Sequence, residues 1–322
     1  MSMRLLPAAV IAAMIMAFIA TKYATAQESE DTSSQKAVLI TGASTGIGRK
    51  MTEVLAANGY FVYAGARKQS DLDALNQIEN VHSIRLDVTI QKEIDAAVET
   101  VRGGGRGLFG LVNNAGVIIA GPMIEVDEND LAWLFDVNVL GPYRITQAFA
   151  PLIIESKGRI TNISSISGIL SFPFYGQYAM SKHAIEAYSD ALAGEMERFD
   201  VKVSVIEPGN FRSQIGKNQA KQLAEQSYAK EGSPFAEDIA DTVDYLADRS
   251  KYKEPDEVAA AAMHALFDDN PKRRYLVVPN QEEADWTIRK AIQELVQLNS
   301  DHTYSYSRAQ LIDMLDEEMA TK

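Results

Sequence analysis

The sequence contains no cysteine and only four histidines, and both shortages limit the chemistry that the protein can perform. Without cysteine the chain forms no disulfide bond and offers no thiol nucleophile. The histidines, at positions 82, 183, 264 and 302, lack metal-ligand spacing, so we expect no metal site. Basic charge is also scarce, because 31 lysines and arginines stand against 44 aspartates and glutamates, a formal net charge of -13. Most of such a surface would repel a phosphate backbone, so we expect no nucleic-acid partner.

The length and composition of the chain fit a single α/β domain. Of its 322 residues, 46% are hydrophobic and 23% are charged. This is ample material for one core of about 250 residues. Short apolar segments alternate with helical patterns, the order expected of a doubly wound parallel sheet. The predicted strands cover residues 37–40, 61–64, 82–86, 108–112, 159–163, 202–206 and 275–278.

A glycine-rich turn, residues 41–48, follows the first predicted strand and precedes a helical pattern. Gly42, Gly46 and Gly48 would let the backbone turn tightly and approach a pyrophosphate. Free N–H groups at the start of the helix would supply the positive end of its dipole. The turn therefore predicts a phosphate-binding site. A second glycine cluster, residues 103–105, precedes a strand instead of following one, so we interpret it as a plain turn.

Tyr178 and Lys182 are four residues apart, a spacing that stacks two side chains on one helix face. The lysine cation favours the tyrosinate, so we expect it to lower the tyrosine pKa from about 10 towards the range useful for acid–base catalysis near neutrality. Tyr175 is rejected as a competitor because the residue four positions later, Ala179, carries no cation. Tyrosine–lysine pairs at this spacing also occur by chance, so the pair gains its meaning from the other motifs.

Taken together, these motifs resemble the short-chain dehydrogenase/reductase family. The glycine turn, the run Asn-Asn-Ala-Gly at residues 113–116, Ser165, Tyr178 and Lys182 occur in family order between residues 36 and 279. The resemblance implies a Rossmann-type fold of the compact single-domain branch. Local motifs are nearest to the retinol and 17β-hydroxysteroid dehydrogenase subgroup. The implied activity is an NAD(P)-dependent oxidoreductase that interconverts an alcohol and its ketone or aldehyde.

The resemblance also implies a role for each site residue. Ser165 lies thirteen residues before Tyr178 (178 minus 165), the family spacing, which selects it over Ser164. Ser165 would bind the substrate oxygen, Tyr178 would act as general acid or base, and Lys182 would also bind the nicotinamide ribose. Asn138 matches the family residue thought to hold a water that links the lysine to solvent. The implied cofactor contacts are Gly42, Ser44, Thr45, Gly46, Ile47, Gly48, Arg67, Asp87, Val88, Asn114, Ala115, Gly116, Tyr178, Lys182, Pro208, Gly209 and Ser213.

The end of the second predicted strand bears on the choice of cofactor. An acidic residue there would bind the ribose 2′-hydroxyl of NAD and repel the 2′-phosphate of NADP. Ala66 stands where the family places an aspartate for NAD, and the adjacent Arg67 can pair with a phosphate through its planar fork. We therefore expect NADP(H) to be preferred, with NAD(H) as the alternative and a merely solvated Arg67 as the opposing interpretation.

The substrate is less determined than the reaction. Apolar residues flank the catalytic motifs and favour a hydrophobic small molecule, although several could instead belong to the core: Ile118, Ile119, Met123, Leu170, Phe172, Phe174, Tyr175 and Phe211. A cofactor-binding redox sensor or regulatory scaffold without turnover is the alternative function, since a fold does not guarantee catalysis. An epimerase or dehydratase is disfavoured, because the chain has the tight family turn and no second substrate domain.

The N-terminus predicts a targeting segment. Arg4 precedes an uncharged apolar run, residues 5–20, and a small-residue site ending at Ala26 follows before Gln27. This layout is typical of a secretory signal peptide cleaved after Ala26 and equally of an uncleaved membrane anchor, with a mis-assigned start as the third interpretation. Export would conflict with the chemistry if the destination lacked NADP(H), so we favour membrane association.

The resulting domain prediction has four parts: residues 1–26 as signal peptide or anchor, 27–35 as linker, 36–280 as the catalytic domain, and 281–322 as a C-terminal helical extension. In the extension, Ile288, Ile292, Leu295 and Leu298 recur at helical spacing, so this helix would cover the pocket or make a subunit contact. By resemblance to the family, we also expect a homodimer or homotetramer formed through the helices that carry Asn138 and Tyr178.

Overall fold

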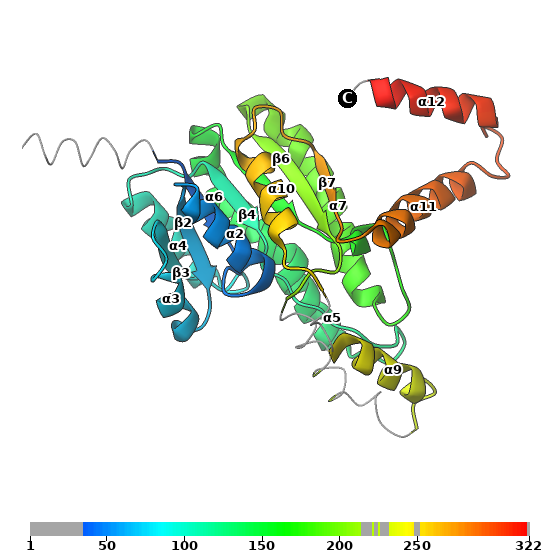
Figure 1. Ribbon diagram of the computed structural model, residues 1–322, viewed down its shortest axis with the longest axis horizontal. Helices are drawn as coiled ribbons and strands as arrows, with labels where there is room; N and C mark the ends of the chain where they lie inside the picture. Colours follow the sequence, from blue (N-terminus) through cyan, green and yellow to red (C-terminus); the bar gives the residue numbers. More distant parts are fainter. Residues whose placement is uncertain (1–34, 214–220, 222–224, 226–231, 248–251, 321–322) are drawn as a thin grey trace, which may run out of the picture.

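A parallel sheet forms the centre of the structure, a computed structural model that describes residues 35–213, 221, 225, 232–247 and 252–320 (Figure 1). Within these residues the sheet has seven strands in the order β3-β2-β1-β4-β5-β6-β7, and every neighbouring pair is parallel. The strands are β1 (Ala37–Ile40), β2 (Phe61–Ala66), β3 (Val81–Arg85), β4 (Gly110–Asn113), β5 (Arg159–Ile163), β6 (Lys202–Pro208) and β7 (Arg274–Val277). The predicted doubly wound parallel sheet is confirmed, with strand ends displaced by one or two residues.

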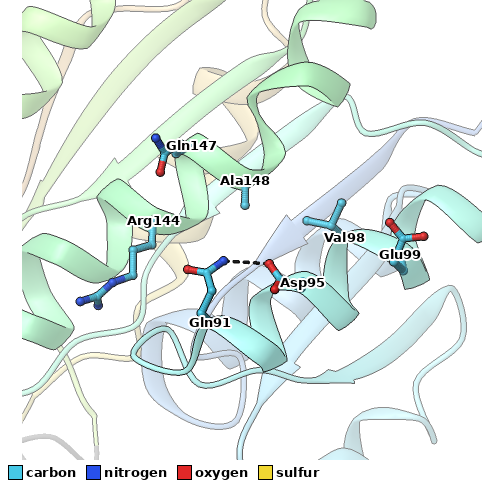
Figure 2. Close-up of a pocket in the computed structure, with 7 residues that line it drawn as sticks. All are labelled: Gln91, Asp95, Val98, Glu99, Arg144, Gln147 and Ala148. Carbon is cyan, nitrogen blue, oxygen red and sulfur yellow. Dashed lines mark hydrogen bonds between the residues drawn. The ribbon is translucent and has the colours of Figure 1, made fainter.

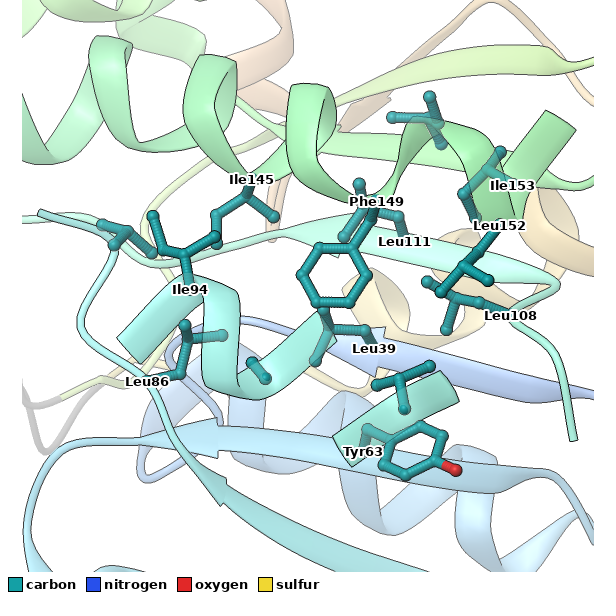
Figure 3. Close-up of a cluster of buried hydrophobic side chains, with 14 of the residues drawn as sticks. Leu39, Tyr63, Leu86, Ile94, Leu108, Leu111, Ile145, Phe149, Leu152 and Ile153 are labelled. Carbon is teal, nitrogen blue, oxygen red and sulfur yellow. The ribbon is translucent and has the colours of Figure 1, made fainter. Parts of the chain in front are cut away.

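Successive residues of each strand supply the two faces of the sheet, because strand side chains alternate in direction. In β1, Ala37 and Leu39 enter one buried cluster and Val38 and Ile40 enter the other. All four are completely buried, as expected of a parallel strand covered on both faces. Figure 3 shows the first cluster, in which Phe149 packs between the sheet and its covering helices.

Two sets of helices cover these faces. Buried residues of α2 (Gly46–Ala57), α3 (Gln69–Leu75) and α10 (Asp256–Phe267) join the cluster that contains Val38. Those of α4 (Gln91–Gly103), α6 (Gly141–Glu155) and α7 (Gly176–Met196) join the cluster that contains Leu39. The remaining helical elements with described residues are α5 (Glu128–Phe135), η1 (Asp136–Leu140), η2 (Ile166–Gly168), η3 (Glu197–Phe199), α9 (Ala236–Ala247), α11 (Gln281–Leu298) and α12 (Arg308–Ala320).

The order of the strands places the site. From β1 the chain adds β2 and β3 on one side of the sheet, and it then adds β4 and the later strands on the other side. The strand order therefore reverses between β1 and β4. In open α/β sheets of this kind, ligands bind outside the carboxyl ends of the strands at such a switch point. The glycine turn follows β1 and the Asn114–Gly116 segment follows β4, so both lie at this place.

The C-terminal extension is helical, as predicted, and extends away from the sheet as α11 and α12 (Figure 1). The apolar stripe of α11, Ile288, Ile292, Leu295 and Leu298, is exposed. The predicted N-terminal segment, residues 1–26, lies outside the described residues, as do nearly all of the linker and half of residues 214–253. Among the helices that the structure describes, none combines the length and apolar character needed to span a membrane.

Candidate active site

The predicted catalytic residues meet where α7 packs against β6 and against the short helical turns η1 and η2. Tyr178 and Lys182 lie one turn apart on α7, Ser165 precedes η2, and Asn138 lies in η1. The Lys182 Nζ and the Asn138 Oδ1 lie 3.9 and 3.5 Å from the point that a Cβ on Gly116 would occupy. The site therefore gathers residues that are far apart in the sequence.

The Tyr178 hydroxyl is poorly solvated, and burial raises its pKa to about 12, opposed only in part by the hydroxyl of Ser165. The expected lowering by Lys182 is therefore wrong for this arrangement. The Lys182 Nζ lies 5.6 Å from the centre of the tyrosine ring and donates a hydrogen bond to the Ile163 carbonyl oxygen at 2.9 Å. The lysine ammonium is thus bound to a carbonyl at the end of β5, and desolvation of the phenol has the largest effect on the Tyr178 pKa.

Lys182 is itself buried, which lowers its pKa to about 8, while the carboxylate of Glu186 acts in the opposite direction. Near neutral pH the lysine therefore carries its positive charge for most of the time, but with little margin. Loss of a nearby negative charge would remove that margin, because burial favours the neutral amine.

Asn138 lies in a π-helical turn, a local irregularity that often occurs at functional sites. Its side chain accepts a hydrogen bond from the Val117 N–H at 2.8 Å and donates to the Val117 carbonyl at 2.9 Å and to the Ser181 hydroxyl at 3.0 Å. These bonds leave the side-chain amide little freedom. They join η1, α7 and the segment after β4 next to the catalytic lysine.

The glycine turn has the shape of a phosphate cradle. Gly42 and Gly46 have φ angles of +66° and +57°, which favour glycine. A Cβ on Gly48 would lie 2.3 Å from the Gly42 carbonyl oxygen and 2.4 Å from the Asn114 Nδ2, so the close approach requires glycine. Thr45 precedes α2 in an extended conformation and makes no side-chain capping bond, which leaves the N–H groups of the first turn to a ligand.

Two polar side chains fix this cradle to the end of β4. The Thr41 hydroxyl accepts hydrogen bonds from the backbone N–H groups of Asn114 and Ala115, both at 3.0 Å. The Asn114 amide donates to the carbonyls of Thr41 and Gly42 at 2.9 and 3.0 Å. The turn is therefore preorganised, and its residues fit the pyrophosphate of a dinucleotide. Ile47 packs against the core beneath it.

At the end of β2, Ala66 is buried and Arg67 extends into solvent, with 61% of its side chain exposed. Its Nη1 lies 3.5 Å from the Asp87 Oδ2. Asp87 accepts two hydrogen bonds from Thr89, and these bonds together with Arg67 lower its pKa despite partial burial. The guanidinium thus lies beside the predicted adenosine site and remains accessible. The Val88 side chain belongs to the core, so only its backbone is free to contact a cofactor.

The opposite end of the predicted cofactor site is built by Pro208, Gly209 and Ser213 after β6. Ser213 lies beside the glycine turn, since its Cβ is 3.1 Å from the place of a Cβ on Gly46. A buried carboxylate from the C-terminal extension supports the turn, because Glu283 accepts a hydrogen bond from the Asn210 N–H at 2.8 Å. A Cβ on Gly209 would lie 2.1 Å from this carboxylate, so the two segments pack closely.

Aromatic side chains gather near the catalytic motif. Phe174, four residues before Tyr178, stacks edge-on against Phe235 with ring centres 6.0 Å apart. Phe172 makes the same kind of contact with Trp286 of α11 at 6.2 Å. Some of the apolar residues considered for the substrate site are core residues instead, because Ile119, Leu170 and Phe211 are buried: the opposing interpretation holds for these three.

A separate surface depression of about 330 Å³ lies between α4 and α6 (Figure 2). Its lining is polar at the rim, where Gln91 donates a hydrogen bond to Asp95 at 2.8 Å and Arg144 projects from α6. None of the predicted site residues lines it. Among the described residues, no group of three or more acidic or histidine side chains is placed to hold a metal ion.

Comparison with known proteins identifies the family of this arrangement. The family model described as short chain dehydrogenase matches residues 36–224. The chain belongs to that family. This short-chain dehydrogenase is 36% identical over 270 residues to the mitochondrial D-beta-hydroxybutyrate dehydrogenase of Rattus norvegicus, covering 76% of the chain and 77% of the relative. Membership makes it an NAD(P)-dependent oxidoreductase that acts on alcohol groups.

Two further relatives carry other names. The 17-beta-hydroxysteroid dehydrogenase type 6 of Homo sapiens is 38% identical over 183 residues, 55% of this chain and 57% of the relative. The NADPH-dependent 3-dehydrocapnine reductase of Ornithobacterium rhinotracheale is 34% identical over 256 residues, 76% and 88% of the two chains. The printed substrates differ widely, so the family resemblance leaves the substrate of this enzyme undetermined.

Solved structures share the fold. A short-chain dehydrogenase from Streptomyces avermitilis superposes with a TM-score of 0.70 at 31% identity, covering 82% of this chain and 95% of that structure. A family member from Burkholderia phymatum in complex with NAD gives a TM-score of 0.68 at 25% identity, covering 85% and 98%. The compact Rossmann-type fold predicted for this short-chain dehydrogenase is therefore confirmed.

The motif analysis missed several polar residues that surround the catalytic group. Thr41 and Glu283 hold the two ends of the cofactor site, as described above. Glu186, Glu207 and Arg274 form an ionic cluster near Lys182, in which the two carboxylates are buried and the arginine is partly exposed. Only Glu186 left a signal in the sequence, because it follows Lys182 by four residues and so lies on the same helix face. The others come from distant segments that motif spacing does not connect.

Proposed function

We propose that this short-chain dehydrogenase interconverts an alcohol and its ketone or aldehyde on a hydrophobic small molecule, with NADP(H) as the preferred cofactor. The observation that carries the proposal is the convergence of Ser165, Tyr178 and Lys182 at the mouth of a preorganised phosphate cradle. A hydroxyl, a phenol and an ammonium at one point provide oxygen binding, proton transfer and charge stabilisation beside a bound dinucleotide.

Each residue has a defined task in this mechanism. The Ser165 hydroxyl binds the substrate oxygen and stabilises the charge that develops on it. The bound cofactor supplies or accepts the hydride. The Tyr178 hydroxyl gives its proton to the oxygen in reduction, or the tyrosinate removes a proton from the alcohol in oxidation. Lys182 binds the nicotinamide ribose and, when bound there, favours the tyrosinate by its charge. Asn138 holds the segment after β4 against this centre.

The protonation of the tyrosine bears on the direction of the reaction. Burial raises the Tyr178 pKa to about 12, so at neutral pH the phenol carries the proton that reduction requires. Oxidation would first need the proton to leave.

The preference for NADP(H) rests on Ala66 and Arg67. A buried alanine presents no carboxylate to repel a 2′-phosphate, and the exposed guanidinium next to it can bind one through two N–H groups. Asp87 holds the arginine loosely at 3.5 Å, which orients it without preventing that contact. The other residues assigned to the cofactor are those of the cradle, the Asn114–Gly116 segment and the turn from Pro208 to Ser213.

A hydrophobic substrate is supported by the side chains around the catalytic motif. Phe172 and Met123 are exposed although they are large and apolar, and both lie next to residues that lead into α7. Phe174 extends this apolar surface, and Phe235 packs against it from a second segment of the chain. Exposed apolar side chains that cluster near a catalytic group are suited to cover a ligand of the same character.

The test measures NADPH and NADH consumption by protein beginning at Gln27, with a panel of hydrophobic ketones, aldehydes and quinones. We expect turnover with NADPH that disappears in Tyr178→Phe. Cofactor binding without turnover in the wild-type protein across the whole panel would instead support a redox sensor or scaffold. A higher kcat/KM with NADH than with NADPH would contradict the cofactor assignment.

Assembly and location complete the proposal. The proposed catalytic unit is residues 36–280, with residues 281–322 as its C-terminal extension. Leu140 on η1 and Met180 on α7 are exposed on the elements that carry Asn138 and Tyr178, which suits the expected pairing of subunits through these helices. Association with a membrane would depend on residues 1–26.

A further inference from the structure

Near the catalytic lysine, a second set of charged side chains joins α7, β6 and β7. The Arg274 Nη1 donates hydrogen bonds to carboxylate oxygens of both Glu186 and Glu207. Its Nη2 lies 3.2 Å from the Asp190 Oδ2 at the surface. Glu186 and Glu207 are buried, and a buried carboxylate is costly unless a cation satisfies it. One guanidinium thus holds two buried acids close to each other.

The second oxygen of Glu186 has a different surrounding. Its Oε1 is buried and has no hydrogen-bond partner, and the same is true of the Ser164 hydroxyl. Both lie near Gly168, because a Cβ on that residue would meet them at 2.6 and 2.8 Å. Buried polar atoms without partners are rare in proteins, and those that occur need an explanation. This carboxylate oxygen is therefore left free on the side opposite its arginine.

The catalytic lysine lies on the same helix as Glu186 and is subject to its charge. Lys182 lies one turn before Glu186 on α7, and helix side chains four residues apart lie on the same face. Both are buried, so their mutual attraction is screened much less than that of a surface pair. Arg274 binds the Oε2 of Glu186, and this bond restrains the carboxylate.

We propose that Glu186 is a positioning residue for Lys182, which keeps the lysine ammonium charged and oriented at the site while Arg274 fixes the carboxylate from the far side. The inference rests on the proposed function, because a charged lysine is what ribose binding and the control of Tyr178 require. Glu186 would act through the lysine and would touch neither substrate nor cofactor. It would thus join the serine, tyrosine, lysine and asparagine as a fifth residue of the site.

The balance of charges around the lysine supports this assignment. Burial lowers the Lys182 pKa to about 8, and this value already includes the opposing effect of the Glu186 carboxylate. The other charged groups of the cluster are Glu207 on β6, Arg274 on β7 and Asp190 farther along α7. Burial and the nearby Glu186 raise the Glu207 pKa to about 7, so near neutrality about half of this second acid is protonated. Of these groups, Glu186 is the one whose charge acts on the lysine.

The decisive experiment titrates Lys182 directly in the protein without cofactor. Lysine labelled with ¹³C at Cε reports the protonation of each side chain by NMR, and Lys182→Met assigns the signal. In Glu186→Gln, which keeps the shape and removes the charge, we expect the titration midpoint of Lys182 to fall by about one pH unit or more, as for a partly buried charge pair. The alkaline limb of kcat/KM should move down by the same amount.

Asp190→Asn is the matched control. It removes a carboxylate from the same arginine and the same helix but from the solvent side, so both midpoints should stay unchanged. An unchanged Lys182 midpoint in Glu186→Gln would overturn the inference. Equal shifts in the two variants would also overturn it, because the effect would then arise from disturbing Arg274.

The test remains decisive if the wild-type protein shows no turnover or if Glu186→Gln does not fold. If the wild-type protein turns over no substrate, the proposed function fails, yet the NMR midpoints still decide whether Glu186 acts on Lys182. If Glu186→Gln does not fold, Glu186→Asp keeps the charge and moves it away from the lysine. It should lower the midpoint by a smaller amount, and no change in that variant would contradict the inference.

Discussion

The environment of single side chains decides how the catalytic group behaves. Tyr178 and Lys182 occupy one helix face, yet burial moves their pKa values in opposite directions, up to about 12 for the phenol and down to about 8 for the ammonium. Desolvation always favours the neutral form, so it raises an acid and lowers a base. At a pH between these two pKa values, the tyrosine is neutral and the lysine loses its charge as the pH rises. The charges around the lysine are therefore important.

Tyr178→Phe should abolish the chemical step and leave cofactor binding intact. A phenylalanine fills the same space but cannot transfer a proton, and such a loss costs about 10²- to 10⁴-fold in kcat. Stopped-flow or steady-state NADPH consumption measures the rate, and quenching of protein fluorescence measures the cofactor Kd. Near wild-type turnover in this variant would show that another group transfers the proton.

Arg67→Ala should weaken NADPH more than NADH. Removing a guanidinium from a phosphate contact costs about 1.5–3 kcal/mol when the hydrogen bonds are charge-assisted. We therefore expect kcat/KM to fall by roughly ten-fold or more with NADPH and to change little with NADH. Arg102→Ala, at another exposed arginine paired with an acid, is the control. Equal losses with both cofactors would remove the basis for the preference.

At the scale of elements, the site depends on contacts between segments that are distant in the sequence. The helix α11 begins with Asn280 as its N-cap, and its first turn carries the Glu283 carboxylate to the N–H of Asn210 after β6. Farther along, Trp286 reaches Phe172 in the segment before α7. The C-terminal extension therefore touches both the cofactor side and the substrate side of the site.

Glu283→Ala should loosen this junction. The Asn210 N–H would lose its hydrogen bond to the carboxylate in a partly buried place, a change that costs about 1–3 kcal/mol. We expect a lower midpoint in urea unfolding and a higher KM for the cofactor, since the turn that follows β6 would lose its support. Glu282→Ala, at the exposed neighbouring position, should change neither. A shift in stability with an unchanged cofactor KM would limit Glu283 to a purely structural role.

At the scale of the whole molecule, the buried ionic cluster joins the edge of the sheet to α7. Arg274 in β7 reaches Glu207 in β6 and Glu186 in α7, across 67 and 88 residues of sequence. Such contacts form only when the whole domain is folded, so their electrostatic energy contributes to the free energy of global unfolding. The pH dependence of stability should therefore report on them.

Glu207→Gln should change that pH dependence. Burial raises the Glu207 pKa from 4.5 to about 7, so the folded protein binds more protons than the unfolded chain between these values. The contribution is fully present below about 4.5 and is lost as the pH rises through about 7. Between pH 5 and 8, the free energy of unfolding of the wild-type protein should fall relative to that of the variant, by at most about 1.4 kcal/mol per pH unit. If urea unfolding gave the same difference in unfolding free energy between the wild-type protein and the variant at every pH, this assignment would be contradicted.

The strand order and the positions of the motifs could be predicted because their signals are local. Each strand is a short apolar run bounded by turns, and the glycine turn lies directly after β1 in both sequence and structure. The positions of the strand ends are predicted less accurately. Leu108 was expected to begin a strand that starts at Gly110, because apolar character continues beyond the residues that form ladder hydrogen bonds.

The sequence by itself determined the α/β fold class, the place of the phosphate cradle and the family motif of Ser165, Tyr178 and Lys182, since periodicity, glycine spacing and motif order are properties of neighbouring residues. Only the tertiary structure decided the protonation of Tyr178, the bond between Lys182 and the Ile163 carbonyl, and the pairing of Arg274 with two buried acids. These depend on how much water is removed and on which distant groups replace it. Solvation and long-range contacts exist only once the chain has folded.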